Sequence, residues 1–238
     1  ERHDIPMSAV AKGLTPTKLW KNRTYGSDWV IGDTVNASIG QGYLLASPLQ
    51  LCVMVARLAS GNLVIPRLIK NIDGIEQPIP ETTRLGMNEN NLQTIRRAMF
   101  KVVNDRRGTA YGSRIIGDAM RMAGKTGTSQ VRNITAAERA RGVSRNEDLP
   151  WERRDHALFV NFAPYDNPKY AVAVVVEHGG GGSTAAAPIA RDITLQALYG
   201  GEPPVEVYPS KDRNRIIQQQ RELRSVRPIA NVSREEQA

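Results

Sequence analysis

Apolar residues follow a helical period in three stretches of the chain. Between residues 89 and 105 they recur at three- and four-residue steps, which predicts an amphipathic helix. The apolar positions of that stripe are Leu92, Ile95, Met99 and Val102. Residues 48–60 are expected to form a second helix, because Ser47 is a suitable N-cap and Gly61 follows the end. Residues 184–199, rich in alanine, are expected to form a third, buried helix.

Apolar residues run almost without interruption through residues 156–163 and 170–177, and a short proline-containing turn separates the two runs. This pattern predicts an antiparallel hairpin. A further strand is expected near residues 122–130. The polar segment 129–155 that follows it contains a candidate short helix at 136–140. This segment is long for a loop, and such loops are often functional.

Three other segments lack a clear period. Residues 1–34 are predicted to be irregular, and residues 62–85 to form short extended pieces broken by prolines. Residues 201–238 are predicted to be a polar C-terminal tail, either disordered or held in part by contacts, outside a domain that covers residues 1–200.

Composition is typical of a globular protein and narrows the function only a little. The chain has 238 residues, of which 40% are hydrophobic and 24% charged, and it contains no apolar run of the roughly 18 residues needed to span a membrane. The net charge is +8, with the excess in residues 67–125, but aromatic residues make up only 5%. Nucleic-acid binding therefore stays open only as a weakly supported alternative, and nucleic acid is not among the expected partners. A solvated basic face, or attraction to an anionic polymer or membrane surface, explains the charge as well. The single cysteine, Cys52, excludes an internal disulfide and is expected to be buried.

The most informative polar stretch is residues 124–130, with the sequence Gly-Lys-Thr-Gly-Thr-Ser-Gln. Lys125 offers a positive charge with three donors, and Thr126 and Thr128 offer hydroxyl groups. Gly127 has no side chain, so a ligand can approach the backbone closely. In a strand the two threonines face one side, and Lys125 and Gly127 face the other. Such a strand suits a ligand that carries a carboxylate and a carbonyl group to be polarised.

Lys-Thr-Gly is one of three sequence elements of the penicillin-binding and β-lactamase enzymes. The chain resembles the transpeptidase domain of the penicillin-binding protein 2 family, the cell-elongation enzymes of Gram-negative bacteria. The resemblance spans residues from about 10 to 200 and rests on five stretches, at 32–43, 47–50, 123–131, 162–168 and 177–180. It implies an α/β penicillin-recognising (β-lactamase/transpeptidase-like) fold, with an antiparallel sheet flanked by helices. Residues 1–200 would be the C-terminal part of that domain, with the N-terminal part missing.

The resemblance also implies a function, that of a peptidoglycan D,D-transpeptidase. Such enzymes cross-link stem peptides ending in D-Ala-D-Ala through a serine acyl-enzyme, some act as carboxypeptidases, and β-lactam antibiotics acylate the same serine. Lys125 would be the catalytic residue of this chain, and Thr126, Gly127 and Thr128 would bind substrate. The N–H group of Thr128 would supply half of an oxyanion hole. No metal or cofactor is implied.

The family also implies a location and partners. The domain would be periplasmic and belong to a protein anchored in the inner membrane. Its partners would be elongation-complex proteins and the missing N-terminal part.

The chain departs from the family pattern in one respect. No serine is followed three positions later by lysine, and Ser8 and Lys12 are four apart. Ser144-Arg145-Asn146 matches the Ser-x-Asn element but follows Lys-Thr-Gly instead of preceding it, so the match is interpreted as coincidence. Both missing elements are expected upstream of Glu1. The chain alone is therefore expected to be inactive and to leave apolar surface exposed.

Several alternatives stay open at this stage. One is a non-catalytic carboxylate-binding or scaffold module. Arg132, Arg153 and Arg154 could bind an anionic glycan or peptide, although solvated charge is the simpler interpretation. The histidines His156 and His178 show no metal-ligand spacing, and His156 is expected to be structural.

Overall fold

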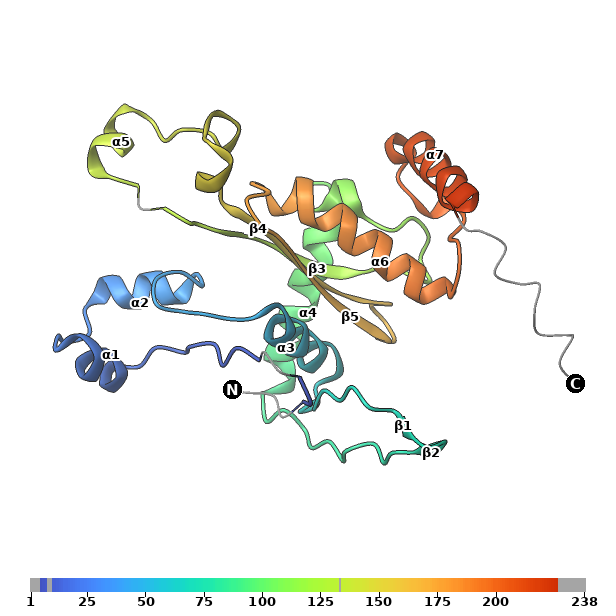
Figure 1. The fold of residues 1–238 in the computed structure, drawn as a ribbon, viewed down its shortest axis with the longest axis horizontal. Coiled ribbons are helices and arrows are strands. Elements are labelled where there is room, and N and C mark those ends of the chain that lie inside the picture. Colours follow the sequence, from blue (N-terminus) through green and yellow to red (C-terminus); the bar gives the residue numbers. More distant parts are fainter. Residues whose placement is uncertain (1–4, 8–9, 133, 227–238) are drawn as a thin grey trace, which may run out of the picture.

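The centre of the structure is a three-stranded antiparallel sheet (Figure 1). The computed structural model describes residues 5–7, 10–132 and 134–226. The strands are β3 (Ala123–Ser129), β4 (His156–Ala163) and β5 (Tyr170–Val176), in the order β3-β4-β5. The predicted hairpin and the third strand are confirmed to within one residue at each end. Because β4 lies in the middle, β3 pairs with a strand on only one side within the described part of the chain.

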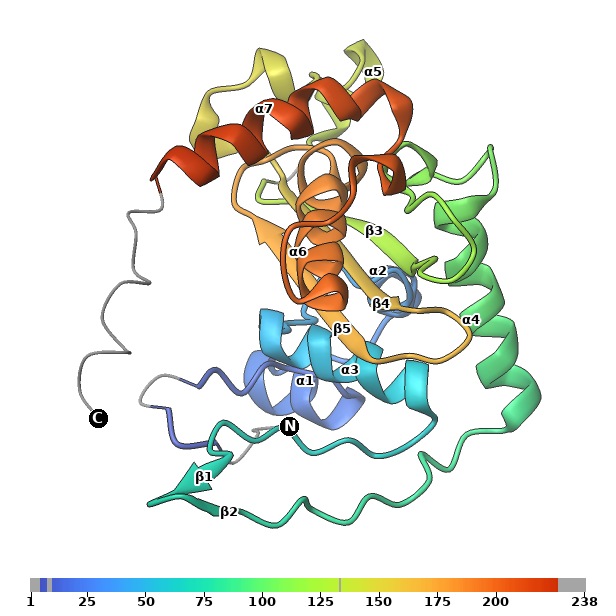
Figure 2. The same cartoon turned by 90° about the vertical axis from the view of Figure 1, so that its right-hand side faces the viewer.

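The two faces of the sheet are covered by different helices (Figure 2). Side chains along β4 alternate between the two faces. On one face Phe159 packs into a cluster with α6 (Ala187–Tyr199). On the other face Phe162 packs into a cluster with α3 (Pro48–Ser60) and α4 (Glu89–Asn104). Both phenylalanines are fully buried. These layers confirm the predicted α/β architecture, an antiparallel sheet flanked by helices.

The helix α3 begins where the capping signals predict. The Ser47 hydroxyl accepts a hydrogen bond from the Gln50 N–H group at 3.2 Å, and the Gln50 side chain accepts one from the Ser47 N–H group at 2.9 Å. Gly61 ends the helix with φ 73°, a value that favours glycine. Cys52, expected to be buried, is half-buried on this helix, and its burial raises the pKa of the thiol.

The prediction of an irregular N-terminal segment is wrong. Two short helices, α1 (Lys18–Tyr25) and α2 (Ile31–Ser38), occupy much of it. Thr17 caps α1 by accepting a hydrogen bond from the Trp20 N–H group at 3.1 Å. An ion pair between Lys21 of α1 and Asp33 of α2, with a 2.5 Å N–O distance, joins them. This contact lies between two segments of the chain, so the periodicity within either segment does not reveal it.

The C-terminal segment is also more ordered than predicted. A helix, α7 (Ser210–Val226), packs beside α6, while residues 227–238 of the predicted tail lie outside the described residues. Arg191 of α6 is fully buried and forms an ion pair with Asp212 of α7, with a 2.6 Å N–O distance. Tyr208 and Ile216 are buried at the same contact. The sequence did not predict this helix because its composition is polar. One buried ion pair and a few apolar side chains are enough to hold it against α6.

The remaining segments connect these elements. Residues 62–85 are extended, as predicted, and include a small hairpin of β1 (Asn71–Ile72) and β2 (Ile75–Glu76). Between β3 and β4 the chain forms an arm that contains α5 (Ala136–Arg141), close to the predicted 136–140, and the turns η2 (Asn146–Asp148) and η3 (Trp151–Arg153). After β5 a π-helical turn, η4 (Gly182–Ala186), leads into α6.

Apolar side chains are exposed on α2 and, separately, at the β1–β2 hairpin. Ile31, Val35 and Ile39 lie at four-residue steps along α2 and its C-terminal end, and their exposed fractions are 84%, 56% and 71%. Ile75 and Ile79, at and after the hairpin, are exposed to 70% and 74%. The expectation of exposed apolar surface is confirmed.

Candidate active site

The open edge of β3 carries the four residues singled out in the sequence. Lys125 and Thr128 are exposed, and Thr126 and Gly127 are half-buried. The pairing with β4 places Lys125 opposite Val160 and Thr126 opposite Phe159. Since Val160 and Phe159 pack into clusters on opposite sides of the sheet, the predicted alternation along residues 125–128 is confirmed.

Thr126 and Gly127 are held by contacts behind the edge. The hydroxyl oxygens of Thr126 and Thr109 lie 3.0 Å apart and share a hydrogen bond. Gly182, at the start of η4, lies directly against the strand, because a Cβ atom added there would come within 2.5 Å of the Gly127 carbonyl oxygen. These contacts fix the strand from the side that faces α6.

The backbone of β3 directs its free hydrogen-bonding groups outward. The Lys125 ammonium donates to the Thr126 carbonyl at 2.7 Å, and the Gln41 side-chain amide donates to the Thr128 carbonyl at 3.2 Å. In an antiparallel strand the N–H and C=O groups of one residue point to the same side. The N–H groups of Thr126 and Thr128 therefore also lie on the open edge, beside the Lys125 charge.

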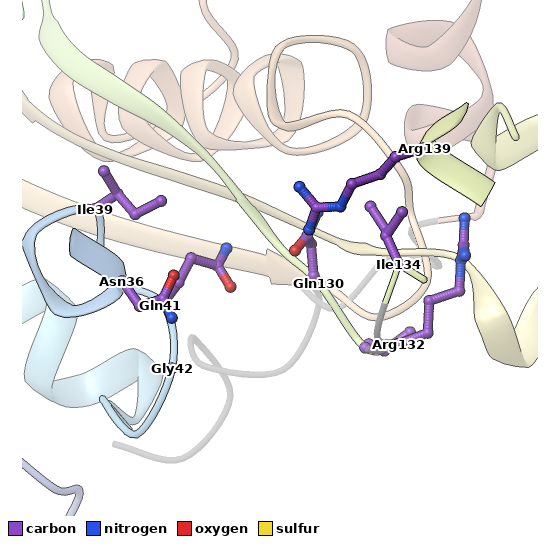
Figure 3. A pocket seen from close by; sticks show the side chains of 9 residues that line it. Asn36, Ile39, Gln41, Gly42, Gln130, Arg132, Ile134 and Arg139 are labelled. Carbon is purple, nitrogen blue, oxygen red and sulfur yellow. The ribbon is translucent and has the colours of Figure 1, made fainter. Parts of the chain in front are cut away.

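A cleft of about 700 Å³ opens where β3 ends (Figure 3). One wall is the end of α2 and the turn that follows it, with Asn36 and Gln41. The other wall is the beginning of the arm, with Gln130, Arg132 and Arg139. The cleft thus adjoins Thr128, because Gln41 lines the cleft and binds the Thr128 carbonyl.

Two of the three arginines considered in the sequence have structural partners. Arg132 forms a two-fold ion pair with Glu138, with N–O distances of 2.7 and 2.8 Å, and its hydrogen bonds hold the pKa of the Glu138 carboxyl below its usual value. Arg154 donates to the carbonyl oxygens of Glu147 and Leu149. Solvated charge is therefore the wrong interpretation for both, because these guanidinium groups bind the arm to itself.

The end of the arm is fixed to the turn after β5. The Gly180 N–H group donates to the Asp155 carbonyl at 2.8 Å, and the His178 N–H group donates to Nδ1 of His156 at 2.9 Å. His156 is thus structural, as predicted. Asn146, which belongs to the formal Ser-x-Asn match, binds the Asp155 side chain and main chain. This role supports the interpretation of the match as coincidence.

Comparison with known proteins agrees with this arrangement. Residues 12–195 match the family model for the penicillin binding protein transpeptidase domain. The chain belongs to this transpeptidase family. It is 38% identical over 215 residues to the peptidoglycan D,D-transpeptidase MrdA of Haemophilus influenzae, and this match covers 87% of this chain and 31% of that protein. It is 37% identical over 194 residues to MrdA of Acinetobacter baumannii, and this match covers 78% of this chain and 27% of that protein.

Solved transpeptidases of the same family are similar in fold. Penicillin-binding protein 2 of Helicobacter pylori, in a complex with MreC, has a TM-score of 0.67 and 33% identity, and the match covers 84% of this chain and 33% of that one. Penicillin-binding protein 2 of Pseudomonas aeruginosa, in complex with WCK 5153, has a TM-score of 0.65 and 37% identity, with coverage of 81% and 39%. The resemblance to penicillin-binding protein 2 and the fold class are confirmed. The chain spans about a third of the length of these relatives.

The sequence did not predict three of the residues that contact the open edge of β3, namely Gln41, Thr109 and Gly182. A signal existed for Gln41, because it lies between Gly40 and Gly42, whose φ values of 76° and 74° require glycine-like conformations. The flanking glycines indicated a turn, and only the structure shows what the glutamine between them contacts.

In the described part of the chain, no group of three or more histidine, cysteine, aspartate or glutamate side chains is placed to hold a metal ion. No helix in that part is both long and apolar enough to cross a membrane.

Proposed function

We propose that the chain is part of a peptidoglycan D,D-transpeptidase that cross-links stem peptides during cell elongation. The observation that carries this proposal is the open edge of β3, where the Lys125 ammonium contacts the Thr126 carbonyl and the Thr128 carbonyl adjoins a cleft through Gln41. The similarity to curated relatives named peptidoglycan D,D-transpeptidase supports the same activity.

In this proposal a peptide ending in D-Ala-D-Ala lies along the open edge. Thr126 and Thr128 hydrogen-bond its terminal carboxylate, and the positive charge of Lys125 stabilises that carboxylate. The Thr128 N–H group donates to the carbonyl oxygen under attack, where such a donor contributes about 3–4 kcal/mol to transition-state stabilisation. Gly127 lets the substrate backbone approach the strand.

The reaction is a double displacement at one carbonyl carbon. A serine oxygen attacks the carbonyl of the penultimate D-alanine, the peptide bond to the terminal D-alanine breaks, and the serine proton leaves on the amine of the released D-alanine. The amine of a second stem peptide then attacks the ester, which forms the cross-link and restores the serine hydroxyl. Lys125 assists these proton transfers. β-Lactams acylate the same serine because their ring carbonyl replaces the scissile peptide.

The attacking serine is proposed to come from outside this chain. No Ser-x-x-Lys element occurs in the 238 residues, and the exposed side chains of Ile31 and Val35 on α2 are suited to packing against further protein. The parent protein is proposed to act in the periplasm from an inner-membrane anchor. Elongation-complex proteins are its proposed partners, since the similar Helicobacter pylori structure is a complex with MreC.

Labelling with fluorescent penicillin tests this function. We expect covalent labelling of the full-length parent protein, none of the 238-residue chain, and loss of labelling in full-length Lys125→Ala. A matched control is Lys101→Ala, which removes an exposed lysine from α4. Labelling of the chain alone would contradict the external serine. A full-length protein that is folded but unlabelled would favour a non-catalytic carboxylate-binding or scaffold module.

A further inference from the structure

The cleft beyond β3 contains an arginine, Arg139, that has no carboxylate partner among the described residues. Arg139 projects from α5 into the space between the two walls, whereas Arg132 turns away from Gln41 (Figure 3). The charge of Arg132 is compensated by Glu138, and no ion pair found among the described residues includes Arg139. The cleft therefore presents one uncompensated positive charge.

Side-chain amides surround this charge. Asn36 and Gln41 lie on the α2 side, and Gln130 lies on the arm side next to Arg139. Each amide offers both donors and an acceptor, which matches the alternating N–H and C=O groups of a peptide backbone. Ile39 and Ile134 add apolar surface to the two walls. A peptide with an acidic group is therefore a better fit than a small inorganic anion, which would leave the amides unused.

The open edge of β3 leads directly into this cleft. A peptide that pairs with an edge strand extends by about 3.3 Å per residue. Gln130 and Val131, which line the cleft, follow the last residue of β3 in the chain. A peptide paired at Thr128 thus reaches the cleft after two or three residues without reversing direction. Gln41 stands at the junction, because its amide binds the Thr128 carbonyl.

We propose that this cleft is a subsite for a carboxylate group on the peptide substrate, and that Arg139 determines the preference for the charged form. The subsite deepens the proposed function and rests on it, since it extends the peptide that lies along β3. An arginine–carboxylate contact is charge-assisted and geometrically specific, so it discriminates a carboxylate from the neutral amide of the same shape.

The test uses the full-length parent protein and two matched sets of synthetic peptides ending in D-Ala-D-Ala. One set carries a side-chain carboxylate, placed in turn at each preceding residue, and the other carries the corresponding amide. Binding is measured by fluorescence anisotropy, and reaction is measured by release of D-alanine. In the wild type we expect tighter binding of the carboxylate form at one position. Arg139→Ala should weaken binding of that peptide about tenfold and change the amide form less than about twofold.

Two control variants make the result specific. Arg141→Ala removes an equal charge from the same helix, but Arg141 does not line the cleft, so it should leave both peptides unchanged. Arg139→Lys keeps the charge without the planar guanidinium and should recover part of the preference. Arg141→Ala should also react with fluorescent penicillin at the wild-type rate, which checks that the variant is folded and active.

The outcomes separate this proposal from the proposed function. Equal losses for both peptide forms in Arg139→Ala, or no loss for either, would overturn the subsite. Tighter binding of an anionic glycan fragment that lacks a peptide, lost in the same variant, would overturn it in favour of a glycan site. Absence of penicillin labelling in the wild type would contradict the enzyme function, while the anisotropy measurement would still report on Arg139.

Discussion

The Gln41 side-chain amide donates a hydrogen bond to the Thr128 main-chain carbonyl, with 3.2 Å between Nε2 and O. The two residues are 87 positions apart in the chain. This contact ties the turn after α2 to the open edge of β3, at the residue whose N–H group is the proposed oxyanion donor. Gln41 is therefore a positioning residue for Thr128 in the proposed reaction.

Replacing Gln41 by alanine should reduce activity more than stability. The lost hydrogen bond is worth about 0.5–1.5 kcal/mol in unfolding free energy. A small displacement of the oxyanion donor should lower the rate of acylation by fluorescent penicillin by roughly tenfold. Acylation kinetics and urea unfolding of the full-length protein measure the two effects.

The matched control for Gln41 is Gln93→Ala, which removes an exposed amide of α4 that donates to Glu89 on the same helix. It should leave acylation unchanged. If Gln41→Ala acylates at the wild-type rate, Gln41 has no positioning role.

Gly182→Ala should disturb β3 from behind. A Cβ atom at this position would lie 2.4 Å from the Leu158 carbonyl oxygen and 2.5 Å from the Gly127 carbonyl oxygen. Both are backbone atoms of paired strands, so the strands or η4 must move. Overpacking of this kind costs about 1–3 kcal/mol. We expect a lower midpoint in urea unfolding and slower acylation by penicillin. Gly201→Ala is the control and should have neither effect, because a Cβ atom there would meet nothing within 4 Å beyond its two chain neighbours. A fully stable Gly182→Ala protein would show that the close packing is not required.

Arg191→Ala should release α7 from α6. The Arg191 guanidinium is fully buried, pairs with Asp192 and Asp212 at 2.8 and 2.6 Å, and lies over the ring of Tyr208. Breaking a buried ion pair by removing one partner typically costs about 3–5 kcal/mol. Limited proteolysis should then cleave within α7 while the sheet stays intact.

Arg221→Ala, which removes an exposed arginine from α7, should keep the wild-type cleavage pattern. Asp212→Asn keeps the side-chain shape and should have a smaller effect, because Asp192 still pairs with Arg191. Identical proteolysis of Arg191→Ala and wild type would mean that apolar contacts alone hold α7.

The contact between α1 and α2 should make stability depend on pH. The hydrogen bond from Lys21, followed by the bond from the Val30 N–H group, holds the pKa of Asp33 below its usual value. The depressed pKa means that the stabilising effect is complete above the unfolded-state value, about 4, and is lost as pH falls through the lower folded-state value. Unfolding of wild type and Asp33→Asn should therefore differ at pH 7 and converge in acid. Asp73→Asn, in the exposed β1–β2 turn, is the control. A difference that persists unchanged in acid would contradict this assignment.

The elements that the sequence predicted well are those whose signals are local. The ends of α3 follow from Ser47 and Gly61, and the strands β4 and β5 follow from two apolar runs around a turn. By contrast, the sequence did not predict α1 and α7. Their stabilising contacts are made with other helices, and the apolar period within a single segment does not report such contacts. For α7 the decisive pair is Arg191 and Asp212, which are 21 positions apart.

The sequence by itself determined the three strands of the sheet, including the one with Lys-Thr-Gly. It also determined which side of that strand each residue faces, because backbone geometry fixes the alternation of side chains along a strand. Only the tertiary structure decided which groups surround that strand. It brought Gln41 to Thr128 and Gly182 to Gly127, and it paired Arg132 with Glu138 while leaving Arg139 in the cleft. The reason is physical: a charge or amide on a loop has no fixed partner until distant segments pack around it.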